Sequence, residues 1–269
     1  MAAVIASPIA ALAPCRAKEK ELDPLHIALL ISAGTAAGLI NTLAGGGSLL
    51  SVPLLVFLGL PGEVANGTNR IGILAQGMMA IRGFRRAGLP SIRLALPILP
   101  PVLIGAWIGA WAIAHIEGAQ FERLFGIVMV LLLIPTLRGS LPGRKDDPPA
   151  RPWPRALQIV VFFAVGLYGG AIQAGAGLFL LMALQRSGFD LVIANSVKVV
   201  VIFSLTAAAV PIFIWADQVD WTAALALFVG FAIGGTIGAW AAVRGGERII
   251  RPVMALAVLA MAGRMLHLY

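Results

Sequence analysis

Long stretches without Asp, Glu, Lys or Arg divide this chain. The first runs from Pro24 to Gly62, with His26 as its only ionisable residue, and a later one runs from Ala156 to Gln185. Only 12% of the 269 residues are charged and 59% are hydrophobic, whereas a soluble domain has about 25% charged residues. A bilayer solvates so much apolar surface, and the sequence therefore predicts an all-α integral membrane protein.

The apolar runs predict a polytopic bundle of about 8–10 helices, because a spanning helix needs about 20 apolar residues. Leu49 to Leu60 and Leu178 to Gln185 are too short to cross. The other segments expected after the first helix are 64–81, 94–114, 124–137, 199–216, 221–243 and 249–268. The predicted organisation is an N-terminal tail (1–24), a first membrane repeat (25–137), a proline-rich basic cytoplasmic linker (138–155) and a second membrane repeat (156–269).

The two halves match each other at one offset of 129 residues, the difference between Gly175 and Gly46. In this register Ile108-Gly109-Ala110-Trp111 matches Ile237-Gly238-Ala239-Trp240, which indicates duplication. Equivalent loops carry opposite charge: the four arginines between Arg82 and Arg93 correspond to a loop that contains Asp217 and Asp220. Basic loops stay in the cytoplasm, so this reversal predicts two inverted-topology repeats.

Each half contains a glycine-rich interruption inside an apolar run. Broken helices occur at membrane depth where the backbone is buried in protein or lines a cavity. The free N–H groups of the second half-helix would attract an anion. The alternative is that these glycines only permit close helix packing. We predict glycine-broken short helices and the following substrate contacts at the breaks: Gly45, Gly46, Gly47, Ser48, Gln173, Gly175 and Gly177.

A polar cluster with one cation follows each interruption by about twenty residues. Amide and hydroxyl donors beside a cation suit a small oxyanion. The alternative is a helix cap at the membrane interface, with the two cations reaching lipid headgroups. The predicted substrate contacts in these clusters are Asn66, Thr68, Asn69, Arg70, Asn195, Ser196 and Lys198.

The segment from Gly38 to Leu55, GLINTLAGGGSLLSVPLL, resembles the sulfite exporter TauE/SafE family. So do Leu58-Gly-Leu-Pro61, Ala65-Asn-Gly-Thr68 and Phe84-Arg-Arg-Ala-Gly88, and the resemblance extends over nearly the whole chain from Leu25. It implies a multi-pass permease of the inner (plasma) membrane for small sulfur-containing anions such as sulfite or organosulfonates. It also implies that the glycine turns and the asparagine clusters contact the substrate.

The predicted function is a secondary carrier with one anion site between the repeats, opened alternately to each side. The sequence has no nucleotide motif, metal-ligand spacing or paired catalytic carboxylates, so we expect no cofactor, no bound metal and no enzymatic activity. The expected partners are the anion and membrane lipids, without nucleic acid, and glycine stripes such as Gly230, Gly234 and Gly238 would permit a homodimer. An anion channel and a non-transport membrane assembly protein remain as alternatives.

Overall fold

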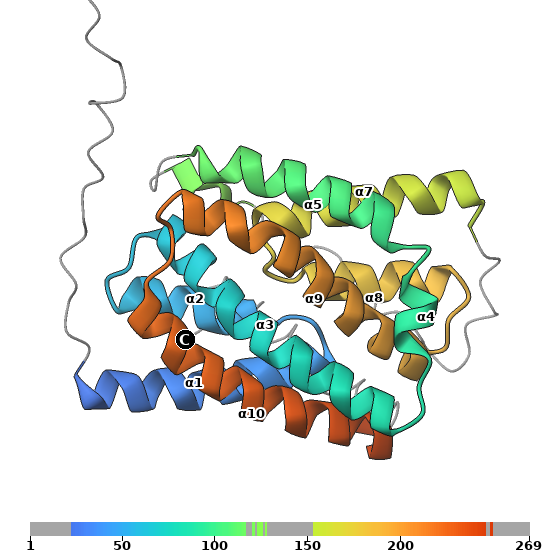
Figure 1. Cartoon of the computed structure of the whole chain (residues 1–269), viewed down its shortest axis with the longest axis horizontal. Coiled ribbons are helices and arrows are strands. Elements are labelled where there is room, and N and C mark those ends of the chain that lie inside the picture. The colour runs from blue at the N-terminus through green and yellow to red at the C-terminus, as the bar shows by residue number, and fades with distance from the viewer. Residues whose placement is uncertain are drawn as a thin grey trace, which may run out of the picture.

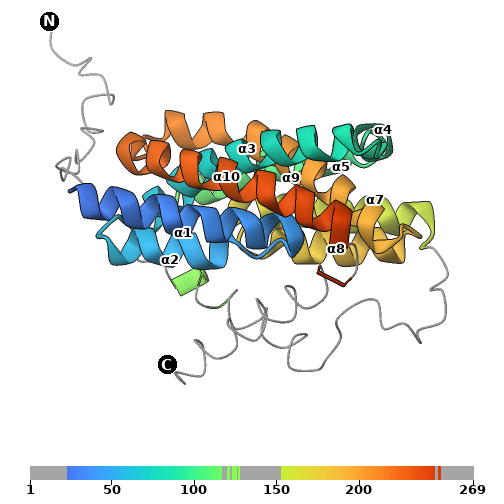
Figure 2. The same ribbon diagram turned by 90° about the horizontal axis from the view of Figure 1, so that it is seen from below.

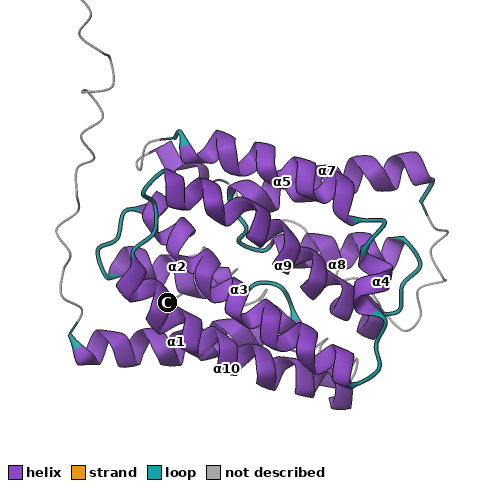
Figure 3. Ribbon diagram, in the orientation of Figure 1, coloured by secondary structure: helices purple, strands orange, loops and turns teal. Residues whose placement is uncertain are grey.

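The computed structural model describes residues 23–116, 120–121, 123–125, 127, 153–245 and 248–249. Over these residues the chain is helical and contains no strand (Figure 3), which confirms the predicted all-helical bundle. The predicted tail, linker, segment 124–137 and segment 249–268 lie wholly or largely outside the described residues. The described helices are α1 (Pro24–Leu43), α2 (Ser48–Phe57), α3 (Gly62–Arg86), α4 (Ser91–Ala95), α5 (Leu99–Ala114), α7 (Arg155–Ala171), α8 (Ala176–Arg186), α9 (Leu191–Trp215) and α10 (Trp221–Gly245).

The long helices lie side by side along the long axis of the molecule (Figure 1). α3 and α9 occupy the middle and pack on each other. α10 and α1 pack along one flank, and α5 and α7 pack along the other. The short helices α2 and α8 lie in a second layer behind α3 and α9 (Figure 2). α3 packs on α10 and α1 of one flank, and α9 packs on α5 and α7 of the other and also reaches α1.

The helices run in two directions. α1, α3 and α10 begin at the end that lies on the left in Figure 1, whereas α5, α7 and α9 begin at the right. α2 turns back toward the left end, from which α1 started, and α8 turns back toward the right end, from which α7 started. With 10 and 11 residues, these two helices are about 15 Å long, half the thickness of a hydrocarbon core.

Helix starts follow from local chemistry. The Asp190 carboxylate accepts hydrogen bonds from the N–H groups of Val192 and Ile193, both at 3.0 Å, and so caps α9. For this reason α9 begins eight residues before the expected segment 199–216. α5 begins at Leu99, later than the expected position 94, because Pro97 and the prolines after Leu99 lack the N–H that a continuous helix requires.

Helices α1, α9 and α10 are long and apolar enough to cross a membrane. Glycines bring the helix backbones close together within each flank, between α1 and α10 and between α5 and α7. A Cβ at Gly234 of α10 would overlap the carbonyl of Thr35 in α1, and one at Gly105 of α5 would overlap the carbonyl of Phe163 in α7. These stripes therefore serve close packing within one chain along both flanks.

The helix termini at the two ends of the bundle carry opposite charge. The left end in Figure 1 holds the acidic residues Asp23, Glu63, Asp217 and Asp220. The right end holds Asp190 together with the basic residues Arg82, Arg85, Arg86, Arg93, Arg155, Arg186 and Arg244. The bundle thus has one predominantly acidic and one predominantly basic end.

Candidate functional site

The two interruptions meet inside the bundle. The first lies between the end of α1 and the start of α2, and the second lies between the end of α7 and the start of α8. The chain reverses direction through left-handed residues, with φ of +87° at Gly45, +62° at Gln173 and +74° at Gly175. A Cβ at Gly45 would stand 2.5 Å from the Cα of Gly177. Backbone therefore touches backbone between the breaks, which only glycine permits.

Arg70 of α3 crosses to the second break. Its guanidinium donates to the carbonyls of Gly169 at 3.2 Å, Gly170 at 2.6 Å and Ala171 at 3.0 Å. These are the last carbonyls of α7, which have no partner within their helix and carry its partial negative charge. The guanidinium also stacks on the Phe213 ring, 4.3 Å from its centroid. A fully buried cation from the first half thus caps a helix of the second half.

Lys198 of α9 does the converse. Its ammonium donates to the carbonyls of Asn41 at 3.2 Å and Thr42 at 3.0 Å, close to the C-terminus of α1. The side chain is 1% exposed. Each half therefore supplies the cation that caps the interrupted helix of the other half.

The charge at the centre is positive. Among the residues that the structure describes, Arg70 and Lys198 are the fully buried charged residues. No Asp or Glu residue among them is fully buried. Each break also brings a helix C-terminus, with partial negative charge, beside a helix N-terminus with partial positive charge, and these two contributions roughly cancel. The formal charge of the two cations is left without a carboxylate, so this region favours an anion.

Several side-chain amides of the buried residues have atoms without a hydrogen-bond partner in the protein. The Asn66 amide donates to the Ala171 carbonyl at 3.0 Å, but its oxygen has no partner among the described residues. Neither amide atom of Asn195 has one, although the residue is 0% exposed. Gln173 donates to the Thr206 hydroxyl at 2.5 Å while its oxygen stays unpaired. Buried polar atoms of this kind need a ligand or water.

The remaining predicted residues divide into two groups. Ser48 and Gly46 are buried at the first break, and Gly47 packs against α1 with its would-be Cβ 2.7 Å from that of Asn41. The carboxamide oxygen of Asn69 accepts from Ser51 of α2 at 2.5 Å. These four residues lie at or beside the break.

Two predicted hydroxyls are engaged elsewhere. Thr68 accepts a hydrogen bond from the Asp220 N–H at 2.9 Å, in the loop between α9 and α10. Ser196 donates at 2.8 Å to the Ile193 carbonyl of its own helix. The structure does not bring these two hydroxyls to the breaks.

Three polar residues that the structure places at the centre are not among the predicted substrate contacts. Asn41 donates to Gln76 at 2.6 Å, Ser51 contacts Asn69, and Thr206 contacts Gln173. All three are polar residues inside uncharged apolar runs, which is a sequence signal for a buried polar centre. The carbonyls capped by Arg70 carry no such signal, because every residue has a carbonyl.

Buried cations and amides inside a bundle of apolar helices define a helical membrane protein with a polar centre. The family model described as sulfite exporter TauE/SafE matches residues 30–265. The chain belongs to the sulfite exporter TauE/SafE family and is a membrane transporter of that family.

Relatives extend over most of the chain. The probable membrane transporter protein ORF9 of Sinorhizobium sp is 26% identical over 242 residues, which cover 89% of this chain and 92% of the relative. The probable membrane transporter protein YfcA of Escherichia coli K12 is 23% identical over 252 residues and 91% of both chains. YunE of Bacillus subtilis, also a probable membrane transporter protein, is 24% identical and covers 80% of this chain and 88% of its own. No solved structure matches the chain.

Proposed function

We propose that this chain is a secondary carrier for small sulfur-containing anions such as sulfite or organosulfonates. The observation that carries the proposal is the pair of buried cations, Arg70 and Lys198, whereas no Asp or Glu residue among the described ones is fully buried. An anion between the two breaks would supply the missing negative charge. The sulfur chemistry comes from the family to which the chain belongs, since a positive centre alone selects for charge.

The carrier is built from two inverted repeats in this proposal. α3 and α9 each have 25 residues, and their starts at Gly62 and Leu191 differ by 129 residues, the offset of the sequence repeat. They run in opposite directions, as do α1 and α7, and α2 and α8 (Figure 1). Duplicated units of opposite direction that meet at broken helices are a common transporter architecture.

The basic end of the bundle faces the cytoplasm of a cell whose inner membrane holds the chain. Seven arginines at helix termini lie at this end, against acidic residues at the other, and basic loops stay on the cytoplasmic side. The start of α1 then lies at the outer face, and the predicted linker leads into the cytoplasmic start of α7. This arrangement crosses the membrane several times.

The substrate oxyanion binds between the breaks through N–H groups of the amides and of the helix N-termini. The Asn195 amide nitrogen has no acceptor among the described residues. The amide nitrogens of Asn66 and Gln173 each donate once, to Ala171 and Thr206, and each carries a second N–H. The N-caps of α2 and α8, Gly47 and Gly175, make no side-chain capping bond. The N–H groups of Leu49, Leu50, Ala176 and Leu178 donate to carbonyls of the breaks themselves. Those of Ser48 and Gly177 make no such bond among the described residues and are the ones that an anion could use. Rocking of one unit against the other would expose this site to each side in turn, driven by an ion gradient or by the gradient of the substrate.

Counterflow of radiolabelled sulfite into liposomes that contain the purified full chain tests the proposal. Sulfite, sulfate or an organosulfonate inside the vesicles should stimulate uptake if the chain is a carrier. Flux without stimulation would indicate an anion channel. The absence of flux for all of these anions would contradict transport and favour a membrane assembly protein.

A double variant, Asn66→Leu with Asn195→Leu, should insert normally and lose counterflow. The matched control replaces two exposed hydroxyl residues, Ser32→Leu with Thr236→Leu, whose side chains bond only to their own helices. Equal activity in both double variants would contradict the assignment of the two asparagines to the site.

A further inference from the structure

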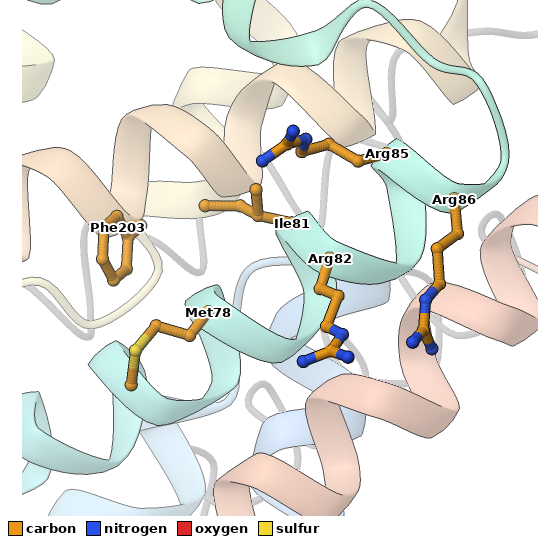
Figure 4. A pocket seen from close by; sticks show the side chains of 6 residues that line it. All are labelled: Met78, Ile81, Arg82, Arg85, Arg86 and Phe203. Atoms are coloured by element: carbon orange, nitrogen blue, oxygen red, sulfur yellow. The ribbon is translucent and has the colours of Figure 1, made fainter.

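A hollow of about 630 Å³ lies at the basic end of the bundle, apart from the two breaks. It is lined by the end of α3, with Met78, Ile81, Arg82, Arg85 and Arg86, and by Phe203 of α9 (Figure 4). In Figure 4 the Arg85 side chain extends toward α9 and that of Arg86 toward α10. Three cations and three apolar side chains thus line this hollow.

The two halves of the hollow differ in chemistry along the helix axis. The arginines occupy the last two turns of α3, whereas Met78, Ile81 and Phe203 extend it toward the interior of the bundle. Met78 is 41% exposed. From Met78 to Arg86 the helix rises by about 12 Å. The hollow therefore continues from the level of the basic helix end into the apolar part of the bundle.

The three arginines have no carboxylate partner among the described residues. The ion pair found there within 4.0 Å joins His26 to Asp23, at the other end of the bundle. The opposite unit does not repeat them. At the offset of 129 residues, Arg82, Arg85 and Arg86 correspond to Pro211, Ile214 and Trp215 of α9. The basic hollow is thus a feature of one unit and one end, and the repeat architecture does not require it.

We propose that this hollow binds an anionic phospholipid of the cytoplasmic leaflet. The phosphate accepts hydrogen bonds from the arginines, and an acyl chain lies against Met78, Ile81 and Phe203. Basic pockets between helices on the cytoplasmic side suit such headgroups. A small free oxyanion would use the arginines alone and gain nothing from the apolar wall, so the amphipathic lining favours a lipid. The bound lipid sits between α3 and α9, the helices that carry Arg70 and Lys198.

Lipid retention measured by native mass spectrometry tests this inference, because it does not depend on transport. The purified full chain is prepared in detergent micelles that contain phosphatidylglycerol or, in parallel, phosphatidylcholine. The wild-type chain should retain phosphatidylglycerol and release phosphatidylcholine. Each arginine near a headgroup contributes roughly a factor of five, so Arg82→Gln, Arg85→Gln and Arg86→Gln together should weaken retention roughly 100-fold.

Two controls separate a built site from general charge. The triple variant Arg93→Gln, Arg155→Gln and Arg244→Gln removes the same charge from exposed arginines at the same end, outside the hollow, and should retain the lipid as the wild type does. Met78→Trp keeps every charge but fills the apolar part, and should weaken retention. Glycerol phosphate, the headgroup chemistry without chains, should not displace the lipid at matched concentration.

Equal loss of phosphatidylglycerol in both triple variants would show diffuse attraction and overturn the proposal. Displacement of the lipid by glycerol phosphate would identify a site for free anions instead. Unchanged lipid retention in Met78→Trp would show that the apolar residues do not contact the lipid, and would also overturn the proposal. Should the triple variant at the hollow fail to fold, Met78→Trp and the competition still decide between lipid and free anion.

Discussion

Replacing Gly45 by alanine tests the contact between the two breaks. The φ of +87° at Gly45 lies in the left-handed region, where a Cβ costs roughly 1–2 kcal/mol. The new Cβ would also stand 2.5 Å from the Cα and the carbonyl carbon of Gly177. Overpacking against backbone adds about 1–3 kcal/mol. The sum of about 2–5 kcal/mol corresponds to a melting temperature lower by roughly 4–20 °C, at about 2–4 °C per kcal/mol.

Two other glycines separate these contributions. Gly88 also has a left-handed φ, +77°, but nothing lies within 4 Å of its would-be Cβ, so Gly88→Ala measures backbone strain alone. Gly46 lacks a left-handed φ, and its Cβ would meet only the Leu49 side chain at 3.4 Å. The expected order of destabilisation is therefore Gly46→Ala, then Gly88→Ala, then Gly45→Ala.

The assay is thermal unfolding of the detergent-solubilised chain, followed by tryptophan fluorescence at one fixed scan rate because such unfolding is often irreversible. Sulfite counterflow in liposomes accompanies it. Gly45→Ala should also lose counterflow, since a displaced Gly177 moves the start of α8. If Gly45→Ala melts together with Gly46→Ala and transports as the wild type does, the backbone contact between the breaks is refuted.

Four further variants test single hydrogen-bonding groups among the predicted site residues. Asn195→Leu should keep or raise the melting temperature, because neither amide atom has a protein partner, yet it should abolish counterflow; a parallel loss of stability would contradict a substrate role. Thr68→Val should lower the free energy of unfolding by about 1 kcal/mol, because the hydrogen bond from the Asp220 N–H is lost. The KM for sulfite should stay unchanged, and a large rise in KM would show that Thr68 contacts the substrate. Arg70→Met should lower the free energy of unfolding by about 3 kcal/mol or more, since three carbonyls of α7 lose charge-assisted donors. Lys198→Met should cost less, because it leaves only two carbonyls of α1 without a donor. The reverse order in thermal unfolding would argue against the capping roles.

The sequence predicted the features that depend on local composition. Uncharged runs are enough to indicate apolar helices, of which α1, α9 and α10 are long enough to cross a membrane. The inverted repeats and the glycine-broken helices stay predictions. The predicted helix boundaries were wrong where a charged residue was taken as the end of an apolar segment. The apolar run that starts at Val199 omits Asn195 and Lys198, but both residues belong to α9, whose start at Leu191 is capped by the Asp190 carboxylate. Both side chains are buried, so a charged residue does not mark the end of this helix.

The partners of the predicted site residues were beyond sequence reasoning. Arg70 and the carbonyl of Gly170 are 100 positions apart, and nothing in either segment specifies the other. The same holds for Thr68, whose partner Asp220 lies in a loop between later helices. Residue type indicated which side chains suit an oxyanion, but the packing of α3 against α7 and α9 decides which of them remain available.

Reciprocal capping gives the proposed carrier a way to couple binding to movement. In the proposed carrier, an oxyanion at the centre would compete with the α7 carbonyls for the N–H groups of Arg70, and with the α1 carbonyls for those of Lys198. Binding would then change the hydrogen bonds that hold the ends of α1 and α7 to the opposite half. α1 packs on α10 and α7 packs on α5, so a shift at either helix end reaches a flank of the bundle. A ligand shifts a conformational equilibrium only through contacts that differ between states, and these hydrogen bonds supply such contacts at the site itself.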